Sequence, residues 1–402
     1  MSKDRFVAVL GTCDTKHDEL AYVRDLVRAA GVEAMLVDVS PLGSEHGDVS
    51  SDEVKAALDG VAESISGAET RGEAVSSMAD ALVAWTEANT SRISGMIGLG
   101  GSGNTALITP AMRTLPIGVP KVMVSTVASG NVAPYVGPND IAMMYSVVDI
   151  AGLNSISRRV LANAAGMIAG AVNTSIETAP SDKPALGLTM FGVTTACVEQ
   201  VVKQLEADYE CFVFHATGTG GQTLEKLADS GSLNGMLDIT TTEVADLLMG
   251  GVMSAGEDRM GAAIRSRIPY VGSCGALDMV NFGAKDTVPD KYKERQLLVH
   301  NEQVTLMRTT PEENTRMGEW IAAKLNQMEG PVRFLIPEKG VSIIDVDGAP
   351  FYDAQADMAL FDALEKNVKQ TEKRKLIRLP HAINDPEFSD ALVKNFQEIA
   401  EH

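Results

Sequence analysis

A glycine-rich segment at residues 98–105, with the sequence GLGGSGNT, is the strongest candidate for a ligand site in this chain. It follows an apolar run typical of a buried strand and precedes a pattern typical of a helix. Exposed backbone N–H groups at the start of such a helix attract phosphate or carboxylate groups. We therefore expect contacts to an anionic small molecule from these residues: Gly98, Gly100, Gly101, Ser102, Gly103, Asn104 and Thr105.

The segment matches parts of two known phosphate-binding motifs. Read as G-x-G-x-x-G, it has its glycines in the right context, but an NAD site expects an acidic residue at the end of the next strand, where Ser125 and Thr126 stand. Read as a P-loop, it has Asn104 in place of the lysine. NAD and Walker-type NTPase sites are therefore both disfavoured. The alternative to a ligand site is a tight turn in which glycine serves backbone geometry alone.

Two further loops are expected at the same edge of the sheet, and together they favour a ligand. The first follows the first apolar run and contributes Gly11, Thr12, Asp14, Thr15 and Lys16. The second contributes Ser129, Gly130 and Asn131. Asp14 is also a candidate ligand for Mg²⁺, directly or through water, and its alternative role is a helix N-cap. Lys16 is either a phosphate contact or an ordinary surface charge.

The second half of the chain offers three candidate catalytic side chains, His215, Glu243 and Asp278. His215 ends a predicted strand and enters a glycine-rich loop at 217–221, where an imidazole can act as an acid or a base. Glu243 stands at a predicted helix start, and Asp278 follows another predicted strand. Cys274 has the pattern of a small buried residue rather than a nucleophile. The spacing alone establishes no Ser-His-Asp or Cys-His site.

The sequence pattern also predicts the strands and helices that position these loops. Residues 6–10 are apolar throughout, as expected for a strand covered on both faces, and a helical pattern and a second strand at 33–39 follow. This β-α-β unit predicts a parallel sheet. Further strands are expected at 95–99, 121–124, 185–191, 211–214, 332–336, 342–346 and 376–379. Further helices are expected at 154–172, after Thr310 and after Asp385.

An aperiodic stretch at 178–184, with proline, serine and aspartate, predicts a domain boundary. We therefore predict an α/β protein with two Rossmann-like domains, 1–180 and 181–402, each a mainly parallel sheet flanked by helices. In such sheets ligands bind outside the carboxyl ends of the strands, where all the candidate loops fall. The first domain carries the nucleotide- or anion-binding loops in this prediction.

Composition disfavours several classes of partner and of structural site. A formal net charge of −20 over 402 residues disfavours binding to nucleic acid or to an anionic membrane surface. The four cysteines lack C-x-x-C spacing, so a zinc site or a disulfide framework is not expected. The first residues lead directly into an apolar strand without a signal-like region, and no window has the length of a membrane span. We expect a cytoplasmic protein.

Six motifs together resemble the Tm-1-like ATP-binding family. They lie at residues 11–16, 98–105, 125–131, 300–301, 307–313 and 379–385, so that the resemblance covers essentially the whole chain. It implies two α/β domains, ATP binding and a homodimer, and it supplies no reaction. The loops that match the motifs are the implied nucleotide contacts.

The leading hypothesis is therefore a nucleotide-binding protein of unknown reaction that holds ATP, with Mg²⁺, on glycine-rich loops. The alternative is a metabolic enzyme that acts on a small phosphorylated or carboxylated metabolite in the cleft between the domains, where His215, Glu243 or Asp278 moves protons. A third hypothesis is an interaction protein whose loops bind another chain.

Overall fold

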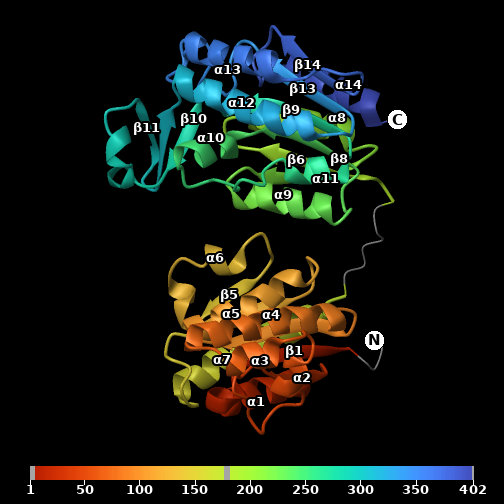
Figure 1. Ribbon diagram of the computed structural model, residues 1–402, viewed down its shortest axis with the longest axis vertical. Helices are drawn as coiled ribbons and strands as arrows, with labels where there is room; N and C mark the ends of the chain where they lie inside the picture. The colour runs from red at the N-terminus through yellow and green to blue at the C-terminus, as the bar shows by residue number, and fades with distance from the viewer. Residues whose placement is uncertain (1–4, 176–181, 401–402) are drawn as a thin grey trace. The chain divides into compact units, whose positions relative to one another are not determined.

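The computed structural model describes residues 5–175 and 182–400. The chain forms two compact units, Met1–Thr178 and Ala179–His402 (Figure 1). Each unit is built around its own parallel sheet with helices on both faces, which confirms the predicted fold class. The predicted boundary after residue 180 itself lies outside the described residues. Over the described residues, no helix has both the length and the apolar character needed to span a membrane.

The N-terminal domain has five parallel strands in the order β2-β1-β3-β4-β5. The strands are β1 (Phe6–Gly11), β2 (Ala34–Asp38), β3 (Ile93–Gly100), β4 (Lys121–Ser125) and β5 (Ala142–Tyr145). The longer helices are α1 (Cys13–Ala29), α4 (Arg71–Asn89), α5 (Ser102–Thr114) and α7 (Ser155–Asn173). The short ones are α2 (Ser51–Lys55), α3 (Val61–Ser66), α6 (Ala133–Val136) and the 3₁₀ helix η1 (Thr126–Ser129).

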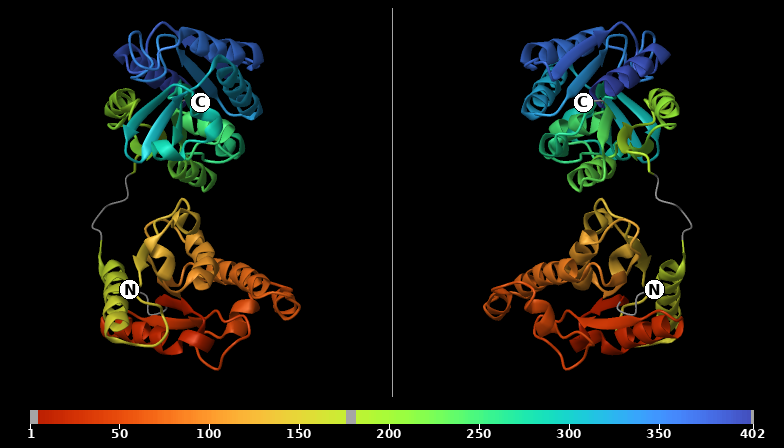
Figure 2. Two further views of the ribbon diagram at one scale, coloured as in Figure 1. Left: turned by 90° about the vertical axis from the view of Figure 1, so that its left-hand side faces the viewer. Right: turned by 90° about the vertical axis from the view of Figure 1, so that its right-hand side faces the viewer.

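Strand β1 lies between β2 and β3 and is buried along its whole length. Helices α1 and α7 cover one face of the sheet and α4 and α5 cover the other, which explains why β1 is a continuous apolar run (Figure 2). The chain leaves β1 toward β2 on one side and returns to β3 on the other. The carboxyl ends of β1 and β3 therefore flank the topological switch point, where doubly wound sheets bind ligands.

The C-terminal domain has six parallel strands in the order β14-β13-β9-β8-β6-β7. Five of them repeat the strand order of the N-terminal domain, and β14 extends the sheet. The parallel strands are β6 (Ala185–Met190), β7 (Glu210–His215), β8 (Gly235–Thr240), β9 (Tyr270–Gly275), β13 (Val332–Pro337) and β14 (Arg374–Leu379). A small antiparallel sheet of order β10-β12-β11 is inserted after β9: β10 (Met279–Phe282), β11 (Leu297–Asn301) and β12 (Val304–Arg308).

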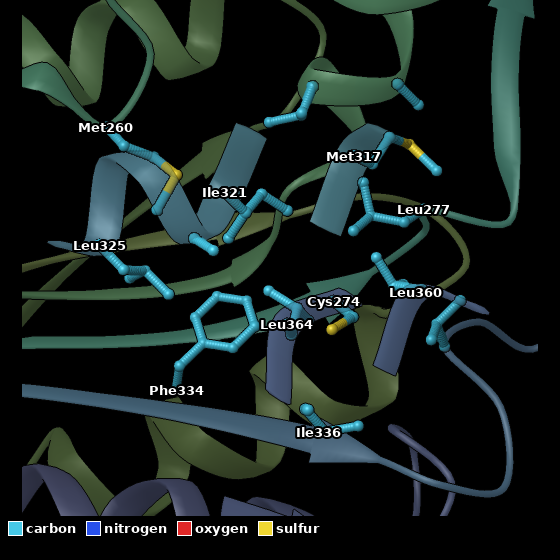
Figure 3. Packing of buried hydrophobic residues seen from close by; sticks show 14 of the residues in the cluster. Met260, Cys274, Leu277, Met317, Ile321, Leu325, Phe334, Ile336, Leu360 and Leu364 are labelled. Carbon is cyan, nitrogen blue, oxygen red and sulfur yellow. The ribbon is translucent and has the colours of Figure 1, made fainter. Parts of the chain in front are cut away.

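Helices α8 (Thr195–Leu205) and α14 (Pro386–Ala400) cover one face of this larger sheet. The other helices of eight residues or more pack on the opposite side: α9 (Thr219–Asp229), α10 (Thr242–Met249), α12 (Pro311–Gln327) and α13 (Ala354–Asn367). The short elements are α11 (Gly261–Ser266), η2 (Lys285–Thr287) and η3 (Asp290–Tyr292). Cys274 lies in this core among Phe334, Ile336 and Leu364 (Figure 3). Burial raises the pKa of its thiol far above the ordinary value, so Cys274 is a packing residue.

Two local predictions had different outcomes. Thr310 and Glu313 form the predicted capping box at the start of α12, with reciprocal side-chain to backbone hydrogen bonds. The predicted strand at 342–346 is wrong, because the structure has turns there. Asp345 accepts a hydrogen bond from the Val341 N–H, and the Ser342 hydroxyl accepts one from the Ile344 N–H. Such local bonds compete with strand pairing.

Candidate functional site

The loops after β1 and β3 meet at the switch point of the N-terminal domain. The Asn104 amide donates to the Leu99 carbonyl at 3.0 Å and to the Thr12 hydroxyl at 3.3 Å. Gly100 has a φ of +155°, and a Cβ there would lie 2.4 Å from the Cβ of Asn104. Glycine is therefore required at position 100 so that Asn104 can join the two loops.

The first turn of α5, formed by Gly101, Ser102 and Gly103, is the open part of this site. Its N-cap is glycine, which has no side chain with which to cap the helix. Ser102 and Gly103 are exposed, and their N–H groups donate to no part of the chain that the structure describes. A Cβ on Gly103 would meet nothing within 4 Å. This turn presents unpaired N–H groups and the positive end of a 13-residue helix to solvent.

Two residues of the same segment that are predicted ligand contacts, Gly98 and Thr105, are buried in packing contacts. A Cβ on Gly98 would lie 2.9 Å from the Ile108 side chain of α5, so this glycine lets α5 pack against the sheet. Thr105 is buried, and its hydroxyl donates to the Gly101 carbonyl and lies 2.6 Å from the Ser125 hydroxyl. The candidate anion-binding surface is therefore smaller than the segment that the sequence motif covers.

The loop after β1 does not offer the same open N–H groups. The Cys13 N–H donates to the Asp38 carboxylate at 3.0 Å, and the Asp14 N–H donates to the Ser40 hydroxyl at 3.2 Å. Asp38 is fully buried at the end of β2. The Asp38 carboxylate thus accepts a hydrogen bond from the start of α1, where an external anion would otherwise bind. Gly11 is needed for packing, because a Cβ there would lie 2.8 Å from Leu20.

The charged candidates in this loop have different surroundings. The Lys16 ammonium donates a hydrogen bond to the Ile150 carbonyl. The Lys16 side chain therefore contacts the loop after β5. Asp14 is exposed, and its carboxylate accepts a hydrogen bond from the Thr15 hydroxyl at 3.2 Å. Within residues 5–175 and 182–400, no three His, Cys, Asp or Glu side chains are grouped to hold a metal ion. Asp14 therefore stays a predicted single ligand for a cation that arrives with the bound anion.

The loop after β4 adds polar groups on the other side of the α5 first turn. The Thr126 hydroxyl lies 3.5 Å from the position that a Cβ on Gly101 would take. Ser129, Gly130 and Asn131 follow and are all exposed. The Asn131 side chain accepts a hydrogen bond from the Ala133 N–H at 3.1 Å, which shapes the turn into α6.

The glycine-rich loop of the C-terminal domain is already filled. The N–H groups of Gly218 and Gly221 donate to one Glu243 oxygen at 2.7 and 3.0 Å. A Cβ on Gly221 would lie 2.1 Å from the other oxygen of this carboxylate. The loop is an anion site, as its sequence suggests, and its anion is part of the chain.

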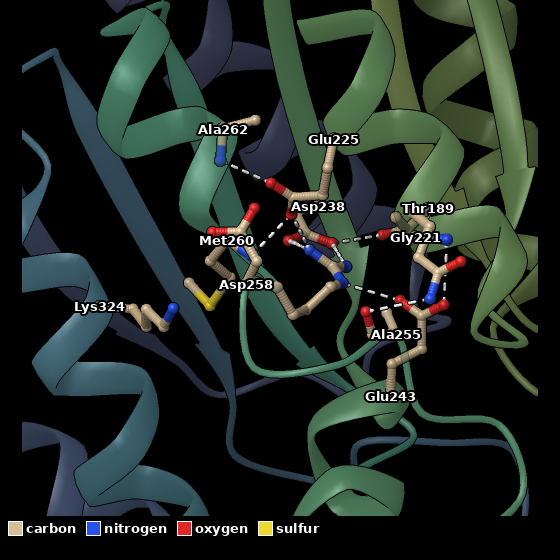
Figure 4. A network of polar contacts seen from close by, with 12 residues as sticks. Thr189, Gly221, Glu225, Asp238, Glu243, Ala255, Asp258, Met260, Ala262 and Lys324 are labelled. Carbon is tan, nitrogen blue, oxygen red and sulfur yellow. Dashed lines mark hydrogen bonds and ion pairs between the residues drawn. The ribbon is translucent and has the colours of Figure 1, made fainter. Parts of the chain in front are cut away.

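Glu243 belongs to a buried ionic network around Arg259, which the sequence does not reveal because Arg259 lies in no recognisable motif. The Arg259 guanidinium contacts Asp238 at 2.5 and 2.7 Å, Glu243 at 2.7 Å and Glu225 at 3.2 Å. Glu225, Asp238 and Glu243 converge from α9, β8 and α10 (Figure 4). Burial raises the pKa of Glu225 and of Glu243, and the nearby Arg259 opposes that shift.

Asp278 lies in a second buried network at the ends of β9 and β13. One of its oxygens accepts the Ser342 hydroxyl at 2.8 Å, and the other has no hydrogen-bond partner among the described residues. Nearby, Arg308 pairs with Asp345 at 3.0 Å and with Asp357 at 2.7 Å. Burial raises the pKa of Asp278 to about 7 and the pKa of Asp345 to about 9.

The three predicted catalytic residues are therefore in separate surroundings. Glu243 and Asp278 belong to different buried networks. His215 is exposed at the end of β7, and its ring stacks on Phe191 with 5.3 Å between centroids. No hydrogen bond joins any two of these three side chains in the described parts of the chain. Their catalytic role stays a prediction.

The second network predicts how stability depends on pH. Asp278 and Asp345 have folded pKa values above the unfolded value of 3.8, so the folded domain holds protons that the unfolded chain loses. We expect the free energy of unfolding of the C-terminal domain to fall as pH rises from about 4 to about 9, through both carboxyl groups up to about pH 7 and through Asp345 alone above it.

Urea unfolding monitored at several pH values measures this dependence. Asp278→Asn, which imitates the protonated carboxyl group, should make the dependence shallower. If the variant keeps the slope of the unmodified chain, Asp278 does not titrate in this range.

Two family models cover nearly the whole chain. The N-terminal domain of the uncharacterised protein family UPF0261 matches residues 5–177, and the C-terminal domain of that family matches residues 183–400. The chain belongs to the UPF0261 family. Both models end close to the limits of the two compact units.

Relatives match this chain over their full length or over part of it. The UPF0261 protein RA0729 of Rhizobium meliloti is 53% identical over 98% of this chain and 99% of its own. The UPF0261 protein mlr3387 of Mesorhizobium japonicum is 50% identical with the same coverage. The ToMV resistance protein Tm-1(GCR237) of Solanum lycopersicum is 43% identical over 98% of this chain and 56% of its own, so the relation to Tm-1 holds. A Streptomyces glycosyltransferase, SsfS6, matches with 11% identity, covers 67% of this chain and 81% of its own, and has a TM-score of 0.19, which supports no argument.

Proposed function

We propose that the N-terminal domain binds ATP, with the phosphates on the α5 first turn. The observation that carries this proposal is that Ser102 and Gly103 present unpaired N–H groups at the switch point of a doubly wound sheet. Two other glycine-containing loops are filled by the chain's own carboxylates, Asp38 and Glu243. This contrast supports the proposal that the α5 turn receives an anion from outside the chain. The motifs shared with the Tm-1-like ATP-binding family point to ATP as that anion.

We further propose that ATP binds as its Mg²⁺ complex. The phosphates bring several negative charges to a chain whose formal net charge is −20. Lys16, the basic side chain of the first loop, already donates to the Ile150 carbonyl. Asp14 is exposed beside this loop and supplies an oxygen ligand of the kind that Mg²⁺ prefers, with phosphate oxygens and water completing the shell.

The proposal extends to a cytoplasmic homodimer, as the family resemblance implies. Gly166 and Gly170 on α7 face open space, and Met167 beside them is 47% exposed. This face of α7 offers a surface for a second copy. Sedimentation velocity of the purified chain measures its mass, and a monomer over the whole accessible concentration range would contradict this part.

Calorimetric titration with ATP, with and without Mg²⁺, tests the proposed function. We expect saturable binding of Mg²⁺–ATP and weaker binding of ATP alone. No binding at ligand concentrations of about 1 mM would contradict the proposal. Binding of a sugar phosphate or an organic acid without binding of ATP would instead favour the enzyme alternative.

A further inference from the structure

The end of β5 carries an exposed aromatic side chain beside the proposed phosphate site. Tyr145 is the last residue of β5 and is 45% exposed. It pairs in register with Ser125 at the end of β4, whose hydroxyl lies 2.6 Å from that of Thr105 in α5. Paired residues of neighbouring parallel strands point to the same face of a sheet. Tyr145 therefore points to the face that carries α5.

The spacing along the sheet edge suits an elongated ligand. β5 lies two strands from β3, so Tyr145 is about 10 Å from the end of the strand that leads into the α5 first turn. The exposed residues Ser129, Gly130 and Asn131 follow β4, the strand between them. A ligand that extends from the α5 turn along this edge passes polar groups and then reaches an aromatic ring.

The backbone after Tyr145 adopts a costly conformation. Val147 has a φ of +67°, which is rare for a β-branched residue, and the Val148 N–H donates to the Ser146 carbonyl at 2.7 Å. Ser146 is buried, and its hydroxyl has no partner among the described residues. Val147 is itself 54% exposed, so packing of its side chain does not explain the strain. Strain of this kind is concentrated at functional sites.

Resting on the proposed function, we propose that Tyr145 is the platform on which the base of the bound nucleotide stacks. The ligand class is then a nucleotide with a flat heteroaromatic base, whereas a sugar phosphate or an inorganic polyphosphate would use the α5 turn alone. Stacking on an aromatic side chain tolerates any base, because every base has a π face. The platform therefore selects for the presence of a base and discriminates weakly between adenine and guanine.

Titrations with Mg²⁺–ATP and with inorganic triphosphate, each on the full chain and on Tyr145→Ala, test this inference. We expect Tyr145→Ala to weaken ATP binding about tenfold and to leave triphosphate binding unchanged, because stacking concerns the base alone. Tyr145→Phe should keep the affinity of the unmodified chain. Tyr352→Ala, which removes a tyrosine of 44% exposure from the C-terminal domain, is the matched control and should change neither affinity.

Each outcome separates the two proposals. If neither ATP nor triphosphate binds the unmodified chain, the proposed function fails. If both bind but Tyr145→Ala leaves ATP affinity unchanged, or weakens both ligands equally, the stacking role is overturned and the phosphate site stands.

Discussion

Replacing Arg259 with methionine is expected to unfold the C-terminal domain. Arg259 is fully buried and is the cation that faces the carboxylates of Asp238, Glu243 and Glu225 in their shared network. Removing one partner of a buried ion pair costs about 3–5 kcal/mol, because the remaining charge stays buried and unpaired. Here three carboxylates lose their partner at once, so we expect a loss at the upper end of that range, comparable to the stability of many domains.

Tryptophan fluorescence during urea unfolding measures this loss. The chain has two tryptophans, Trp85 in the N-terminal domain and Trp320 in the C-terminal domain, so a Trp85→Phe background reports on the second domain alone. Arg265→Met is the matched control, because its pairs with Asp229 and Asp258 are solvent-exposed. The control should cost less than about 1 kcal/mol. Equal effects of the two substitutions would show that the Arg259 network is not structurally important.

Much of the fold follows from local sequence patterns. The continuous apolar run of β1 and the helical spacing of α1 are properties of neighbouring residues, and both are confirmed. The capping box of α12 is equally local, because Thr310 and Glu313 lie three residues apart. The apolar residues at 342–346 predict a strand, but the side-chain hydrogen bonds of Ser342 and Asp345 stabilise turns there.

The sequence does not predict whether the N–H groups of a glycine-rich loop are open or already bound, because this depends on side chains distant in sequence. Cys13 donates to Asp38 across 25 residues, and Gly218 donates to Glu243 across 25 residues. Both loops have the composition of an open anion site. Only tertiary structure shows that a carboxylate already occupies each of them, and that the α5 first turn is left open. The role of each glycine also depends on its tertiary contacts. Gly98 allows close packing, whereas Gly103 faces open space.

Gly103→Glu is expected to weaken ligand binding strongly without destabilising the fold. A Cβ at position 103 has nothing within 4 Å, so the new side chain has room. A carboxylate in the first turn of a helix stabilises it by about 0.3–1 kcal/mol through the helix dipole, and replacing glycine within a helix adds about as much. The same carboxylate occupies the N–H groups and repels the phosphates. We therefore expect affinity for Mg²⁺–ATP to fall by at least about tenfold while stability stays equal or rises.

The most direct measurement is a calorimetric titration of Mg²⁺–ATP into the unmodified chain, Gly103→Glu and the neutral control Gly103→Gln. We expect binding to the unmodified chain, retained binding to Gly103→Gln, and binding to Gly103→Glu that is at least about tenfold weaker, with an equal or higher urea midpoint. ATP binding of equal strength in Gly103→Glu and the unmodified chain would contradict this expectation, since the phosphates would then lie elsewhere than on the α5 first turn.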